Sequence, residues 1–191
     1  MKPVGIVSLV MVLLSLTAMA CPNRPRASQY QASAKQEPPH ANGAAPVIDT
    51  AKWKIYRNEK YGFEVKYPET WNAHSGSGTG VDLISLDGPF RGSQRPSLTL
   101  AIQRNQNPGK RSIEEWFADQ LHALGATPQS TGHMTIGGRP AVFMENTNSF
   151  GKRHDTFILL HETNVLSLSY SSQAEYDPIY TSIVITFRAA K

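Results

Sequence analysis

The chain has 191 residues, a formal net charge of +4 at neutral pH and a single cysteine. A lone cysteine excludes an internal disulfide framework. The positive charge is too small to indicate a nucleic-acid partner, and removal of residues 1–20 would lower it to +3, because Lys2 is the only charged residue there.

The first twenty residues have the three parts of a secretory signal peptide: Lys2, an apolar run and small residues at the end. The run is barely long enough to span a bilayer, which disfavours an uncleaved transmembrane anchor. Ala18 and Ala20 fit the A-x-A pattern of ordinary signal peptidase. The segment that ends at Cys21 also resembles a bacterial lipobox, with Ala18 where leucine is usual. Both alternatives place the cleavage before Cys21.

Cys21 is interpreted as a lipid-attachment residue, against the alternative of a free N-terminal thiol. An unpaired thiol is a liability in an oxidising compartment, and lipidation would remove that liability. Lipidation would also explain why the cysteine stands directly after the cleavage site. The sequence therefore predicts an exported lipoprotein that is anchored in a membrane through a lipid on Cys21 and faces the periplasm or the extracellular side.

Residues 21–50 are predicted to form a disordered, proline-rich tether. Five prolines occur there among Ala, Ser, Gln and Asn, and Tyr30 is the only aromatic residue. Such a segment cannot bury enough apolar surface to offset the entropy lost on ordering. Fully extended, about thirty residues at roughly 3.1 Å each would reach about 90 Å from the membrane.

Residues 51–191 have the size of one domain, and their first half is typical of β-strands. Residues 63, 65 and 67 are apolar and alternate with Glu64 and Lys66, which predicts a half-buried strand that ends at Pro68. Strands are predicted at residues 53–56, 62–68, 81–86 and 97–103. The glycine-rich residues 76–80 do not fit a phosphate loop, because a strand pattern follows them and no Gly-Lys-Ser/Thr occurs, so a mobile connector is favoured.

A helix is predicted from Ser112 to Leu124. Ser112 and Glu115 form a capping box, apolar residues follow at helical spacing, and Gly125 can supply the left-handed stop. Four more strands are expected at residues 133–136, 139–146, 154–161 and 165–170, with Gly137 and Gly138 in the first turn. The last segment is β-branched, but the spacing of its apolar residues from 176 to 187 favours a helix with Asp177 as its N-cap. The prediction is an α+β domain in which an antiparallel β-sheet is flanked by helices.

Several short motifs resemble those of the PsbP-like domain family. They are YGFEVKYPETW at residues 61–71, the helix that starts at Ser112, the glycines after Ile136 and the closing IVITFR at 183–188, in which Thr186 replaces the usual serine. The resemblance spans residues 53–188 and implies an α-β-α sandwich of the Mog1/PsbP type. The family is associated with binding and assembly, and includes photosystem II accessory proteins and bacterial lipoproteins. The residues of the photosystem functions have no match in this chain and are not carried over.

No catalytic residue, metal ligand or cofactor is predicted. None of the six histidines falls in a compact ligand spacing. His154 and His161 could meet with Glu145 or Glu162 on adjacent strands, but an odd separation puts the two histidines on opposite faces of a regular strand. No Gly-x-Ser-x-Gly elbow occurs, and no base can be assigned to a serine.

The strongest surface signal is a stretch of cations without acidic residues, from Gly88 to Ile113. It contains Arg91, Arg95, Arg104, Lys110 and Arg111. Solvated loop cations are the simpler interpretation. The alternative is a surface for an anionic partner, such as lipid headgroups, an acidic cell-wall polymer or an acidic protein.

The sequence favours a non-catalytic binding or assembly module for an envelope or membrane-complex partner. This module would be tethered to a membrane and would not bind nucleic acid. A small-ligand carrier or a hydrolytic enzyme with a cleft beside the sheet is the alternative. Convergent titratable groups in such a cleft would favour the alternative.

Cys21→Ser should move the protein from the membrane fraction to the soluble fraction, because it removes the thiol that would carry the lipid. An inhibitor of lipoprotein signal peptidase should make the precursor of the wild type accumulate. Immunoblots of fractionated cells measure both. Unchanged processing in the presence of the inhibitor would contradict lipidation at this residue.

Overall fold

The computed structural model describes residues 48–190 except 93, 150 and 162. The predicted signal peptide, Cys21 and the tether as far as residue 47 lie outside the described residues. Within the described part of the chain, no helix is long and apolar enough to cross a membrane.

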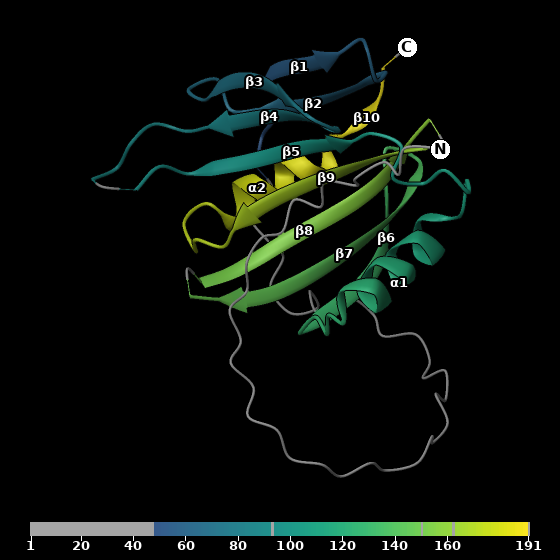
Figure 1. Ribbon diagram of the computed structural model, residues 1–191. Helices are drawn as coiled ribbons and strands as arrows, with labels where there is room; N and C mark the ends of the chain where they lie inside the picture. Colours follow the sequence, from purple (N-terminus) through teal and green to yellow (C-terminus); the bar gives the residue numbers. More distant parts are fainter. Residues whose placement is uncertain (1–47, 93, 150, 162, 191) are drawn as a thin grey trace. The chain divides into compact units, whose positions relative to one another are not determined.

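Ten strands form two antiparallel sheets among the described residues (Figure 1). The larger sheet has seven strands, in the order β3 (Asn72–Gly78), β4 (Val81–Asp87), β5 (Ser97–Gln103), β9 (Asn164–Ser171), β8 (Gly151–Leu160), β7 (Arg139–Asn148) and β6 (Ser130–Ile136). The smaller sheet contains β1 (Lys54–Asn58), β2 (Phe63–Tyr67) and β10 (Arg188–Ala189), with β2 in the middle. Every strand pairs with its neighbours antiparallel.

Helix α1 (Ile113–Leu124) covers one face of the larger sheet over β7 and β8. The predicted capping box is confirmed: the Glu115 amide donates to Ser112 Oγ at 3.2 Å, and the Ser112 amide donates to Glu115 Oε2 at 3.1 Å. Gly125 ends the helix with φ 58°. Trp116 and Phe117 are buried against Phe157 of β8. The apolar stripe read from the sequence is therefore the packing face of the helix.

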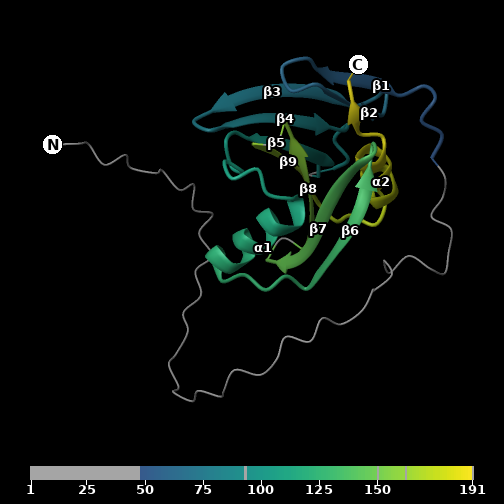
Figure 2. The ribbon, with the colours of Figure 1, turned by 90° about the vertical axis from the view of Figure 1, so that its right-hand side faces the viewer.

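The opposite face of the larger sheet packs against the small sheet and helix α2 (Asp177–Ile185), and this contact forms the main core. The core residues of the central strand β5 alternate as expected for a sheet with one buried face: Leu98, Leu100 and Ile102 are fully buried. Figure 2 shows α1 and α2 on opposite sides of the sheet. The predicted α+β fold with helices on both sides of an antiparallel sheet is confirmed.

The last segment forms a helix despite its β-branched composition. Tyr180, Ile183 and Val184 are buried on one side of α2, so the apolar spacing outweighed the local propensity. The helix begins one residue away from the prediction, because Tyr176 occupies the N-cap position. The Asp177 carboxylate instead accepts from the Gln173 amide at 2.9 Å and from Ser172 Oγ at 2.6 Å, and so fixes the loop before the helix.

Two expectations from the sequence were wrong, and one strand was missed. Residues 76–78 are not part of a connector but form the end of β3, which pairs with β4, and only residues 79 and 80 make the turn. The first two predicted strands do not join the larger sheet. They form the small sheet with β10, a two-residue strand that the sequence did not predict, because so short a strand has no periodicity.

Gly137→Ala should destabilise the fold more than Gly138→Ala. Both glycines have positive φ, 56° and 77°, so an alanine costs about 1–2 kcal/mol at either position. Only at Gly137 would the added Cβ also meet backbone, 2.5 Å from the Phe187 carbonyl oxygen, whereas Gly138 faces open space. Thermal unfolding should show the lower Tm for the Gly137 variant. Equal losses would contradict the close approach of this turn to the chain after α2.

Candidate functional site

An open groove lies between the β1–β2 hairpin and the β3–β4 hairpin. It has a volume of about 630 Å³ and is lined by residues 56–61, 75–77 and 82–84. Ligand sites of proteins commonly have volumes of roughly 300–1,000 Å³. The groove therefore has the size of a binding site, and it brings together segments that the sequence analysis did not connect.

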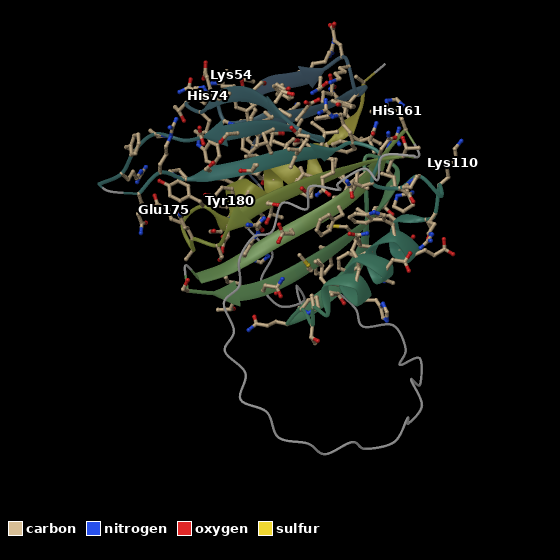
Figure 3. All side chains as sticks on the ribbon, in the orientation of Figure 1. Lys54, His74, Lys110, His161, Glu175 and Tyr180 are labelled. Atoms are coloured by element: carbon tan, nitrogen blue, oxygen red, sulfur yellow. The ribbon has the colours of Figure 1, made fainter. Side chains whose placement is uncertain are left out.

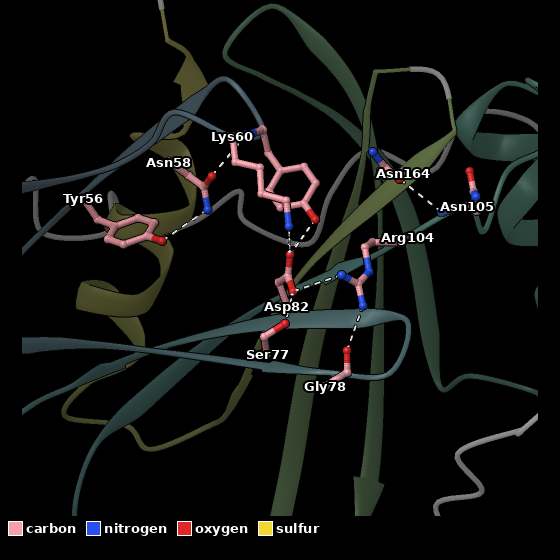
Figure 4. Close-up of polar contacts among 10 residues, drawn as sticks. Tyr56, Asn58, Lys60, Ser77, Gly78, Asp82, Arg104, Asn105 and Asn164 are labelled. Carbon is pink, nitrogen blue, oxygen red and sulfur yellow. Dashed lines mark hydrogen bonds and ion pairs between the residues drawn. The ribbon is translucent and has the colours of Figure 1, made fainter.

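The Asp82 carboxylate is the centre of the polar contacts in the groove (Figure 4). Its Oδ2 accepts from the Tyr61 hydroxyl at 2.5 Å and from Lys60 Nζ at 2.7 Å. Its Oδ1 accepts from Ser77 Oγ at 2.6 Å and lies 3.6 Å from Arg104 Nη1. Asp82 therefore accepts three hydrogen bonds and has Arg104 as a further ion-pair partner. The carboxylate joins the two hairpins to the end of β5.

The same contacts keep both Asp82 and Lys60 in their charged forms. The hydrogen bond from Lys60, followed by those from Ser77 and Tyr61, holds the pKa of Asp82 well below its usual range. The hydrogen bond to Asp82 is also the largest cause that raises the pKa of Lys60 above its ordinary value. Both shifts favour the charged forms, so the pair stays ionised through the physiological range. This is a fixed ion pair, not a group that exchanges a proton near neutral pH.

The rim of the groove is held by Asn58 at the end of β1. Its Nδ2 donates to the Tyr56 hydroxyl at 3.2 Å, and its Oδ1 accepts from the Tyr61 amide at 3.1 Å. Lys60 lies over the Tyr61 ring at 4.8 Å from the centroid, with 63% of its side chain exposed. The ammonium is therefore the solvent-exposed part of the ion pair, since the Asp82 side chain is only 13% exposed.

The five cations that were predicted as an anion surface fall into two groups at opposite ends of β5. Arg91 and Arg95 lie in the β4–β5 connection, whereas Arg104, Lys110 and Arg111 lie between β5 and α1. Figure 3 places Glu175, the partner of Arg91, and Lys110 on opposite sides of the domain.

Each arginine of this set has an acidic partner. Arg91 pairs with Glu175 at 2.8 Å, Arg95 with Asp87 at 3.4 Å, Arg104 with Asp82 at 3.6 Å, and Arg111 with Asp119. Arg104 also donates to the Gly78 carbonyl at 2.8 Å. Of the predicted set, Arg104 is thus the residue that contacts the Asp82 carboxylate of the groove. The anionic-partner surface itself stays a prediction.

The two histidines that the sequence analysis compared are far from a common site. His154 of β8 lies 3.0 Å from Glu145 of β7 and stacks on Tyr170 at 4.8 Å between ring centroids. Burial lowers the pKa of His154, and the nearby Glu145 raises it in part. His161 lies in the turn after β8, where its Nε2 is 2.9 Å from the Tyr61 carbonyl oxygen (Figure 3). Both side chains act as structural contacts.

Two further buried carboxylates are also held by neighbouring side chains. Asp155 accepts from both Arg153 and Ser169 on the face of the larger sheet that carries α1. Glu64 lies between Arg57 and Arg188 on the small sheet, and the hydrogen bonds from these two arginines lower its pKa. These contacts stabilise the sheets. The groove differs from them because the exposed Lys60 ammonium lies beside a cavity.

Comparison with known proteins gave similarities to solved structures. No family model matches the chain, and no curated protein matches it. The domain is similar to cyanobacterial PsbP from Synechocystis sp. PCC 6803, with 12% sequence identity and a TM-score of 0.49 over 78% of this chain and 98% of that one. It is also similar to a protein of unknown function from Pseudomonas aeruginosa, with 17% identity and a TM-score of 0.43 over 70% of this chain and 94% of that one.

A protein from Bacteroides thetaiotaomicron is a third similar structure, with 14% identity and a TM-score of 0.43. The match covers 73% of this chain and 49% of that one, so this chain spans about half the length of that protein. The cyanobacterial protein among these similar structures is named PsbP, like the family whose motifs the sequence resembles.

Sequence reasoning missed the groove because its residues are not a motif. Lys60 and Asp82 are 22 positions apart and meet only through the placement of two hairpins. One signal was present: Asp82 occupies a position of β4 that alternates with the buried Ile84 and Leu86, where a carboxylate needs a partner. The identity of that partner could not be read from the sequence.

Asp82→Asn should lower Tm at pH 7, and its difference from the wild type should shrink as the pH falls below about 4. The folded chain has the lower pKa for Asp82, so the ionised carboxylate stabilises the fold above the unfolded value, and this stabilisation is lost as the pH falls through the folded value. Thermal unfolding at pH 7 and pH 3 measures the effect. Glu59→Gln, which removes an exposed charge from the same rim, is the control. An equal difference at both pH values would contradict the assignment.

Proposed function

We propose that the domain is a non-catalytic binding module that holds a partner of the cell envelope in the groove between its two hairpins. A lipid on Cys21 would keep the module at a membrane, on the periplasmic or extracellular side, and residues 21–50 would let it reach a partner away from the bilayer. The proposal thus has two parts, a binding groove and a tether, which can be tested separately.

The observation that carries the proposal is the fixed ion pair of Lys60 and Asp82. A general acid or base needs a pKa near the working pH, but the contacts in the groove move the pKa of Asp82 down and that of Lys60 up. Such a pair can orient and neutralise a bound group without exchanging protons. The neighbouring Tyr61 and Ser77 hydroxyls both donate to Asp82 and so support its ionised form.

A small-ligand carrier is the second candidate, and the volume of the groove supports it. About 630 Å³ is enough for a small molecule, and the half-buried Tyr56 gives the cavity an aromatic wall. A macromolecular partner would contact the rim of the open groove, whereas a small ligand would contact mainly the walls. Crosslinking from the rim therefore separates the two candidates.

A photo-crosslinking amino acid at Tyr56 should capture a specific protein in intact cells. The same amino acid at Leu124, which is 69% exposed at the end of α1, is the matched control away from the groove. Lys60→Glu should reduce the Tyr56 crosslink, because it places a negative charge beside Asp82 in place of the exposed cation. Immunoblotting and mass spectrometry identify the adducts.

Equal capture from both positions, or a Tyr56 adduct that Lys60→Glu leaves unchanged, would contradict a partner in the groove. The absence of any protein adduct at Tyr56, together with a small molecule that copurifies with the wild type and not with the Lys60 variant, would favour the carrier. Loss of the adduct in a Cys21→Ser strain alone would show that capture depends on the tether.

A further inference from the structure

The outermost strand of the larger sheet, β3, has an open edge. It pairs with β4 on one side, and no described strand pairs with its other side. Figures 1 and 2 show it at the end of the sheet that is remote from β6. An edge of this kind presents backbone N–H and C=O groups that can pair with another extended chain.

The sequence of β3 lacks the usual protection of such an edge. It reads NAHSGSG, with no lysine and no proline, its last four residues are only glycine and serine, and all of its residues except the half-exposed Ala73 are exposed. Natural edge strands are commonly blunted by lysine, proline or a bulge. The small side chains of β3 allow another backbone to approach closely.

Side-chain contacts within the domain also order both ends of β3 in the absence of a partner. Ser77 Oγ donates to Asp82 at 2.6 Å, and Arg104 donates to the Gly78 carbonyl at 2.8 Å, which fixes the end of β3 near the turn. At the other end, His74 Nε2 lies 3.8 Å from Asp87 of β4. A strand that is already ordered loses less conformational entropy when it binds a partner.

The register places one side of β3 over the groove. Ala73, Ser75 and Ser77 stand opposite Leu86, Ile84 and Asp82 of β4, and directly opposite residues of an antiparallel pair share a face. Ser75, Ser77, Asp82 and Ile84 all line the groove. A strand added outside β3 would therefore direct every second side chain to the groove face.

We propose that β3 accepts an extended peptide segment of a partner protein as an additional strand of the larger sheet. Alternate apolar side chains of the peptide enter the groove against Tyr56, and an acidic side chain meets the exposed ammonium of Lys60. This inference rests on the proposed function and specifies how the partner is bound. Backbone pairing gives the affinity, and the groove selects the side chains.

Proline substitutions at two neighbouring residues of β3 test the open edge. Two are needed because only one of the two residues points its N–H group away from β4. Along an antiparallel strand, the N–H and C=O groups of successive residues point alternately to the two sides. One of Ser75→Pro and Gly76→Pro therefore removes a bond to β4 and lowers Tm, while the other removes only an outward N–H and leaves Tm near that of the wild type. The variant that retains its Tm is the test variant. His133→Pro and Met134→Pro, at two exposed neighbouring positions of the opposite edge strand β6, give a matched control chosen by the same criterion of retained Tm.

The probe is a phage-displayed library of random twelve-residue peptides, selected on the full-length chain in detergent. The test variant of β3 should bind the selected peptides at least about ten-fold more weakly than the wild type, and the β6 control should bind them unchanged. Synthetic copies with single N-methylated residues should lose binding at alternate positions only, because half of the peptide N–H groups face β3.

Equal binding by the wild type and the β3 test variant, N-methyl effects without alternation, or failure to select any peptide would overturn the proposal. Concentration-dependent self-association that the β3 test variant abolishes would overturn it in favour of a second copy of this chain as the occupant. The test variant can also be examined with the Tyr56 crosslinker in cells. If the test variant still forms the partner adduct, strand addition is refuted but the binding module is not. If the wild type forms no protein adduct, the binding module is refuted as well.

Discussion

Aromatic contacts between the two ends of the described domain hold the small sheet on the larger one. The Phe63 ring of β2 stacks on Phe187 at 5.6 Å between centroids, and Trp71 meets the edge of Tyr180 of α2 at 5.8 Å. The Tyr180 hydroxyl also accepts from the Ser97 amide at 3.1 Å, which ties α2 to the start of β5. Since the small sheet forms one wall of the groove, the groove exists only while these contacts hold β1 and β2 in position.

The Asp82 ion pair adds a polar link to this apolar attachment. Lys60 and Tyr61 come from the β1–β2 turn, and both donate to a carboxylate on β4 of the other sheet. Packing of aromatic rings fixes the distance between the sheets but leaves some freedom in their relative orientation, whereas hydrogen bonds to one carboxylate are directional. The combination explains how an open groove can keep a defined shape, which a binding site needs if it is to lose little entropy on binding.

The sequence predicted the elements with strong periodicity or caps. The capping box at Ser112 and the apolar spacing of residues 176–187 identified both helices, and the alternation of residues 63, 65 and 67 correctly predicted a strand with these residues on its buried side. It failed at β3, because a strand of glycine, serine and other small residues has no alternation of hydrophobicity to detect. The groove depends on that strand and on contacts between residues distant in sequence, so its residues could not be predicted even though Tyr61 belongs to a recognised motif.

The pairing of β10 with β2 has a consequence for the order in which the domain can fold. The Lys66 amide of β2 donates to Thr186 Oγ1, across 120 positions of sequence, and β2 obtains its second neighbour only from residues 188 and 189. A growing chain therefore cannot complete the small sheet until residues 188 and 189 have been made. Until then Phe63 lacks its stacking partner, and the nascent chain has no finished core on that side of the sheet.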